Sequence, residues 1–119
     1  MPGLVGFTRG AEGGGECAAR LDAMARLVTH RGFHRRDADV CTPLACGTRV
    51  HTGILQPDAQ PGGRDGVSVW LDGELFHLPG EGGRGHAAAF AAMYAADPGM
   101  GFLRGLDGIY AAVVLDAPR

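Results

Sequence analysis

The chain has 119 residues, of which 45 % are hydrophobic and 20 % charged, and its formal net charge at pH 7 is −2. This size and composition predict one globular domain, residues 1–119, with a modest core. The small negative charge gives no reason to expect a nucleic acid as partner, and no apolar run approaches the roughly 20 residues of a membrane span.

The cysteines and the start of the chain predict a cytoplasmic protein. Cys17, Cys41 and Cys46 are an odd number without the spacing of a disulfide framework or a zinc site. We therefore expect them to be small buried residues in a reducing compartment. The first residues also lack the basic segment and apolar stretch of a secretory signal.

The first half of the chain predicts strands and one helix. Residues 4–8 are a short apolar run, typical of a buried strand. Cys17, Leu21, Met24 and Val28 repeat at helical spacing, so we expect a helix from about residue 16 to residue 29. The segments that follow are a polar loop at residues 33–39 and two strands, at residues 40–46 and 49–55.

The second half predicts another strand and a second helix. Residues 67–71 alternate between apolar and polar side chains and lead into Asp72-Gly73, a dipeptide typical of hairpin turns. Residues 86–96 are rich in alanine and stop before Pro98, which predicts a helix. Two further elements complete the prediction: a helical turn at residues 102–106 and an apolar strand at residues 109–115.

This order of elements predicts an α+β fold. The order is strand, helix, several strands, helix and strand. It favours antiparallel pairing with the helices on one face of the sheet. The last strand is as apolar as a central strand, although only Asp-Ala-Pro-Arg follows it. Because an unpaired apolar edge promotes association, we expect residues 109–115 to pair with another chain or to make the isolated chain prone to aggregate.

Four stretches of the sequence resemble one known family. They are MPGLVGF at the start, THRGFH at residues 29–34, LDGELF at residues 71–76 and FLRGLDGIYAAVVLD at residues 102–116. Together, and in this order, they resemble motifs of the N-terminal glutaminase domain of the asparagine synthetase and beta-lactam synthetase family, the class II glutamine amidotransferases. The resemblance covers essentially the whole chain, but it implies that the chain is only the N-terminal part of such a domain and contains no synthetase domain. The family's downstream Arg-Asp-x-x-Gly-x-x-Pro-Leu-Tyr stretch and the Ser-Gly-Gly-x-Asp-Ser loop of its synthetase domain are not in this sequence. The resemblance implies part of an αββα sandwich of the N-terminal-nucleophile (Ntn) hydrolase type, with antiparallel sheets and two main helices.

The nucleophile of this family is replaced. Active members begin Met-Cys-Gly-Ile-Val-Gly-Phe, and removal of the Met exposes a Cys whose own amine is the general base. Here the second residue is Pro2, which carries no thiol. A proline amine can act as a base, but nothing in the adjacent motif offers it a reaction partner. The resemblance therefore implies that this domain has no catalytic residue.

The glutamine pocket of the family is only partly kept. Arg49 matches the arginine that binds the substrate carboxylate, although an exposed strand arginine is an equal alternative. Asp72 replaces the Asn that donates to the oxyanion, and an ionised Asp has no donor. Gly73 and Glu74 match the family, whereas His86 replaces the carboxylate that pairs with the substrate ammonium.

An empty pocket of this kind would leave charges unpaired. No substrate zwitterion would separate Arg49 from Glu74, and an unpaired charge in a partly buried cleft is costly. We therefore expect Arg49 and Glu74 to pair with each other, or with Asp72 and His86, and to close the pocket from within.

Two other candidate sites are weaker. His30 and His34 lie four residues apart and could form a metal pair on a helix, but the helix is expected to end near Gly32, which favours a solvated loop and no metal. Cys41 or Cys46 could act as a nucleophile, although no recognisable base motif accompanies either.

The resemblance implies a non-catalytic glutaminase-like domain or subunit of an ATP-dependent enzyme that forms amides or lactams. Such enzymes make beta-lactams or macrolactams in bacterial natural-product biosynthesis, and this domain would be a scaffold for a synthetase domain or chain. The chain itself would carry no cofactor. ATP and Mg would bind the synthetase partner, which would take a peptide or small-molecule substrate. The alternatives are a non-enzymatic amino-acid or peptide-binding module and, less favoured, an independent cysteine hydrolase.

Overall fold

A computed structural model describes residues 3–11, 13–39, 45–53, 58–63, 66–78 and 85–117. These residues form an α+β fold with two helices and two antiparallel sheets, as predicted. In chain order the elements are β1 (Gly3–Thr8), α1 (Gly14–Val28), β2 (Arg35–Asp39), β3 (Ala45–His51), β4 (Val67–Phe76), α2 (His86–Ala96), the 3-10 helix η1 (Gly101–Arg104) and β5 (Asp107–Asp116).

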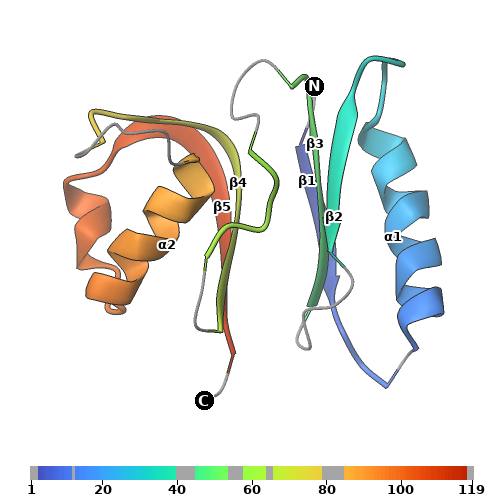
Figure 1. The fold of residues 1–119 in the computed structure, drawn as a ribbon, viewed down its shortest axis with the longest axis horizontal. Helices are drawn as coiled ribbons and strands as arrows, with labels where there is room; N and C mark the ends of the chain where they lie inside the picture. The colour runs from blue at the N-terminus through green and yellow to red at the C-terminus, as the bar shows by residue number, and fades with distance from the viewer. Residues whose placement is uncertain are drawn as a thin grey trace.

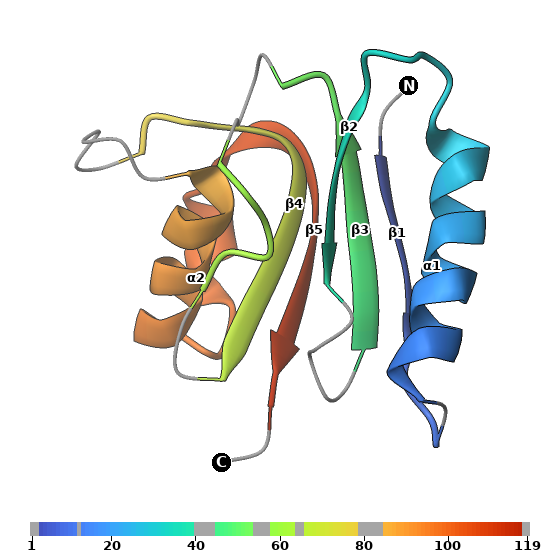
Figure 2. The same cartoon turned by 45° about the vertical axis from the view of Figure 1, so that its right-hand side comes forward.

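The two sheets lie face to face between the two helices. The first sheet has the antiparallel order β1-β3-β2, and the second pairs β4 with β5. Figure 1 shows α1 outside the first sheet and α2 outside the second, and Figure 2 shows the same layers after rotation. The prediction of both helices on one sheet face is wrong, because each sheet presents one face to its own helix and the other to the opposite sheet.

Helix α1 packs through the first half of the predicted apolar stripe; Met24 and Val28 are only half-buried, and Ala25 is buried instead. Cys17 and Leu21 are buried and form one core cluster with Cys46 of β3, against which Phe7 of β1 packs. The burial of Cys17 and Cys46 confirms that both are small core residues. Cys41 lies outside the described residues.

Helix α2 has the bounds that the sequence predicts and covers β4. Phe90 is 2 % exposed and belongs to a core cluster with Val69 and Leu71. Its ring meets those of Phe102 and Tyr110 edge to face, an arrangement that aromatic pairs prefer. Among the described residues, neither α1 nor α2 is long and apolar enough to cross a membrane.

The predicted loop at residues 33–39 is wrong in its second part, where β2 pairs with β3. Strand β2 lacks apolar alternation because it is an edge strand, and edge strands commonly carry charges. The two strands predicted at residues 40–46 and 49–55 are replaced by β3. Residues 40–44 and 54–57 lie outside the described part of the chain.

The predicted turn at Asp72-Gly73 is also wrong, since β4 continues through it to Phe76. Gly73 has φ +112 and lies opposite Tyr110 in the ladder with β5. A Cβ at this position would collide with the carbonyl oxygen of Ile109. The glycine is therefore required by a local distortion within a continuous strand.

Candidate functional site

Strand β3 directs charged side chains into the space between the two sheets. Successive strand residues point to opposite faces, and Cys46 packs toward α1. Gly47 faces the other way, where a Cβ would lie 2.9 Å from the ring of Trp70 on β4. Arg49 and His51 share the side of Gly47. Because facing sheets usually bury apolar residues, an arginine and a histidine here mark a candidate polar site.

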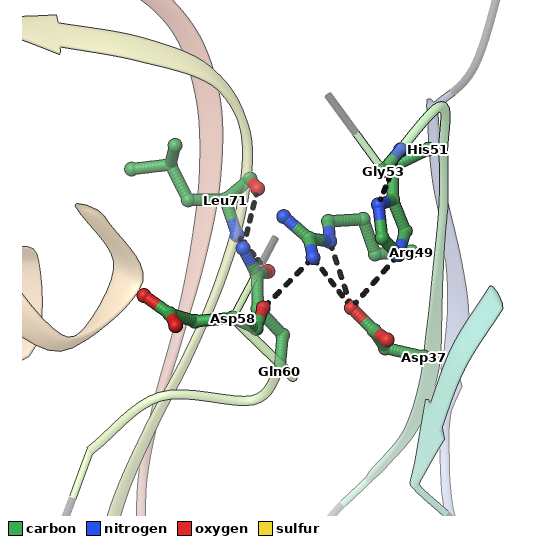
Figure 3. A network of polar contacts seen from close by, with 7 residues as sticks. All are labelled: Asp37, Arg49, His51, Gly53, Asp58, Gln60 and Leu71. Carbon is green, nitrogen blue, oxygen red and sulfur yellow. Dashed lines mark hydrogen bonds and ion pairs between the residues drawn. The ribbon is translucent and has the colours of Figure 1, made fainter. Parts of the chain in front are cut away.

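Arg49 is engaged by internal groups through Nε and Nη2. Its side chain lies opposite Asp37 in the β2–β3 register and is 2 % exposed. Nη2 and Nε donate to the same Asp37 oxygen, Oδ2, at 2.6 and 3.0 Å. Nη2 also donates to the carbonyl oxygen of Asp58 at 2.9 Å, as Figure 3 shows. The guanidinium thus binds the Asp37 carboxylate in the way that it would bind the carboxylate of a ligand.

The Asp58 carbonyl is held in place by its neighbour Gln60. The buried Gln60 amide donates to the Leu71 carbonyl at 2.9 Å and accepts from the Leu71 N–H at 2.8 Å (Figure 3). Both backbone groups of this β4 residue are therefore satisfied by one side chain. Gly62 adds a backbone bridge to Val69. The segment is thereby fixed along β4, close to the guanidinium of Arg49.

His51 completes the cluster and is held by a backbone hydrogen bond. Its Nδ1 accepts a hydrogen bond from the N–H of Gly53 at 3.1 Å, so the neutral form of the ring carries its proton on Nε2. Nε2 lies 3.4 Å from Asp37 Oδ2 and is buried without a hydrogen bond. Because Nδ1 is occupied and Nε2 is protonated, the ring has no nitrogen ready to act as a general base.

Asp72 borders this cluster from the second sheet. Burial raises the pKa of its carboxyl above the ordinary value of 3.8, while the charges of Arg49 and His51 act in the opposite direction. Burial is the larger effect. In the family that the motifs resemble, this position holds an oxyanion donor. Here it holds a carboxyl group whose ionisation is disfavoured by burial.

The remaining residues of the predicted pocket lie along β4 and at the start of α2. Gly73 and Glu74 follow Asp72 on β4, and His86 is the first residue of α2. Nδ1 of His86 accepts a hydrogen bond from the backbone N–H of Leu75 at 2.9 Å. This imidazole thus ties α2 to β4.

The expected pairing of Arg49 with Glu74 is wrong. The ion pair of Arg49 is with Asp37, and the Arg49 charge lowers the pKa of Asp72 against the larger effect of burial. The reason is register, since Asp37 lies directly opposite Arg49 on the neighbouring strand. Pro2, at the nucleophile position, lies outside the described residues.

The space left beside His86 is small. A cavity of about 40 Å³ is lined by residues of the segment around Gln60 and of the start of α2. This volume suits one or a few water molecules, whereas ligand pockets measure roughly 300 Å³ or more. The cavity does not accommodate an amino acid such as glutamine.

Sequence reasoning missed three members of the cluster, namely Asp37, His51 and Gln60. Asp37 stands in the polar run Arg35-Arg36-Asp37, which reads as a loop rather than as an edge strand. His51 lies two residues after Arg49, and this spacing would have placed both on one face of a strand. Gln60 carries no local signal, because its role depends on Leu71, eleven residues away.

The other candidate sites gain no support. The chain has left α1 by His30, and His34 meets the ring of Phe33 edge to face. In the described part of the chain, no group of three His, Cys, Asp or Glu residues is placed to hold a metal ion.

Comparison with protein-family models, with curated proteins and with solved structures gives no significant match. The family resemblance rests on the four sequence motifs.

Proposed function

We propose that the chain is a glutaminase-like domain that has lost glutaminase chemistry and serves as a scaffold in an ATP-dependent amide- or lactam-forming enzyme. The partner in this proposal is a synthetase domain or chain of the asparagine synthetase type, which binds ATP and Mg and activates a carboxylate. The enzyme acts in bacterial natural-product biosynthesis, on a peptide or small-molecule substrate that supplies its own amine.

One observation carries the proposal: the guanidinium at the position of the substrate-binding arginine is bound by Asp37 and by the Asp58 carbonyl. A pocket that binds glutamine needs this group free for the α-carboxylate. If a substrate carboxylate displaced Asp37 from Arg49, the Asp37 carboxylate would lose its partner in a buried place. Leaving such a charge unpaired is costly. The helix–sheet–sheet–helix layering is compatible with the Ntn hydrolase fold that the motifs imply.

The same observation weakens the alternative of an amino-acid-binding module. A sensor must offer free charges to the amine and the carboxylate of its ligand. Arg49 is buried in an internal network, and the cavity of about 40 Å³ near His86 is too small for an amino acid. Calorimetric titration with glutamine separates the two functions, since a scaffold gives no heat of binding and a sensor gives a saturable heat.

Two measurements test the scaffold. The 119-residue chain incubated with glutamine should release no glutamate above a boiled control. The protein purified from its native source should contain, on the same or an associated chain, an activity that exchanges pyrophosphate with ATP when a carboxylic acid is supplied. Glutamate release, or a native protein that is alone and lacks pyrophosphate exchange, would overturn the proposal.

A further inference from the structure

Strand β5 pairs on one side only within the described part of the chain. All ten of its residues are in register with β4, from Asp107 opposite Phe76 to Asp116 opposite Val67. An edge strand directs half of its backbone N–H and C=O groups away from its sheet. Two apolar side chains on its face toward the first sheet are exposed, Ile109 to 78 % and Val113 to 48 %.

A larger cavity opens beside this strand, between the two sheets. Its volume is about 280 Å³, close to the lower end of ligand pockets. Its walls come from four strands: Leu4 belongs to β1, Gly47 to β3, Trp70 to β4, and Val113 and Leu115 to β5. None of the described residues that line it is charged. The cavity therefore suits apolar side chains that enter beside β5.

The charges at the ends of β5 argue against a second copy of the chain as the occupant. Asp107 and Asp116 are both exposed, and antiparallel pairing of β5 with itself over its full length would place each Asp107 opposite an Asp116. Like charges that face each other across strands are destabilising, whereas opposite charges are favourable. The same two carboxylates favour a strand that carries a basic residue at each end.

We propose that β5 is a docking edge for an extended strand of a partner protein, with an apolar centre and basic ends. The backbone of this strand would continue the sheet beyond β5, and its inward side chains would enter the cavity next to Trp70. Backbone hydrogen bonds supply affinity in this mode of recognition, and side-chain pockets supply specificity. The inference concerns a different face from the closed polar cluster and does not depend on the proposed function.

Synthetic peptides test the proposal directly on the 119-residue chain. The probe is a fluorescein-labelled peptide, Lys-Val-Thr-Val-Thr-Val-Thr-Val-Thr-Lys, and its binding is followed by fluorescence polarisation. Trp70 is the one tryptophan of the sequence, so its emission reports entry of side chains into the cavity. We expect saturable binding together with a shift of the Trp70 emission. A peptide with Glu at both ends should bind about tenfold more weakly because of repulsion by Asp107 and Asp116.

A matched pair of variants locates the binding site. Ile109→Lys adds charge to the β5 face, and Leu27→Lys makes the same kind of change on α1, where the residue is also 78 % exposed. Both positions are exposed enough for the fold to tolerate lysine. Ile109→Lys should weaken binding of the Lys-ended peptide at least about tenfold, and Leu27→Lys should leave it unchanged. A peptide with N-methyl groups on alternate amides should not bind, since it cannot extend a sheet.

Several results would overturn the proposal. They are absence of binding by the Lys-ended peptide, equal binding by the two variants, or retained binding by the N-methylated peptide. A wild-type chain that sediments as a dimer and an Ile109→Lys chain that sediments as a monomer would instead identify a second copy as the occupant, and would also overturn it.

Discussion

Arg49 and Asp37, directly opposite each other on β3 and β2, meet through two hydrogen bonds to a single carboxylate oxygen, at 2.6 and 3.0 Å. The Arg49 side chain is 2 % exposed and that of Asp37 is 15 % exposed. In the family that the motifs resemble, the guanidinium at this position binds the substrate carboxylate. Here it binds Asp37. A substitution in this pair should therefore be detected first as a change in the free energy of unfolding.

Replacing Asp37 with alanine should destabilise the chain by about 3 kcal/mol, because it leaves the buried Arg49 charge without its counter-ion. Urea denaturation followed by Trp70 fluorescence measures the free energy of unfolding. The matched control is Asp22→Ala, which removes the carboxylate that forms solvent-exposed ion pairs with Arg26 and Arg36. This substitution should lower the free energy of unfolding by less than about 1 kcal/mol. Equal effects of the two substitutions would show that the Arg49 cluster is not structural.

Replacing Asp72 with asparagine should stabilise the chain at neutral pH. Burial raises the pKa of this carboxyl in the folded state above its ordinary value of 3.8. The folded protein therefore binds the proton more tightly than the unfolded chain does. The stabilisation that this proton provides is fully present below pH 3.8 and is lost as the pH rises through the folded-state pKa.

The pH dependence gives the check on Asp72. The difference in unfolding free energy between Asp72→Asn and the wild type should grow with pH above 3.8 and then level off. The control Asp107→Asn removes a carboxylate from an exposed end of β5. A difference that shrinks as the pH rises would mean that the attraction of Arg49 and His51 outweighs burial.

Replacing Gln60 with alanine should cost about 2 kcal/mol or more, because it leaves the N–H and the carbonyl of Leu71 without partners in a buried place. The amide proton of Leu71 should then exchange with solvent faster than in the wild type, which hydrogen exchange read by NMR detects. An unchanged exchange rate would mean that other groups protect this amide.

Replacing Gly73 with alanine should be destabilising by about 2 kcal/mol or more, since a Cβ at φ +112 is strained and collides with the Ile109 carbonyl. Thermal unfolding by circular dichroism measures the loss. Gly15→Ala serves as the control, because this residue of α1 has open space around it and alanine favours helices. That variant should be slightly more stable than the wild type. A tolerated Gly73→Ala would show that β4 relaxes at this point.

The local elements of this protein could be predicted from the sequence. Helix α2 has its predicted bounds, and α1 follows the apolar repeat of Cys17 and Leu21. The strands at residues 3–8 and 107–116 also contain the apolar runs, at residues 4–8 and 109–115, that predict them. These signals are local, because burial of one face imposes a periodicity on a short stretch of residues. The replacement of the family nucleophile by Pro2 is likewise visible in the sequence alone.

The tertiary structure decided how these elements meet. The sequence indicates that Arg49 needs a counter-charge, but Asp37 became its partner only because β2, a strand without apolar alternation, pairs with β3 in one register. Likewise, Asp72-Gly73 has the composition of a turn, yet the ten-residue ladder of β4 with β5 carries the strand through it. Register and the facing of sheets depend on contacts between residues distant in sequence, so no local pattern encodes them.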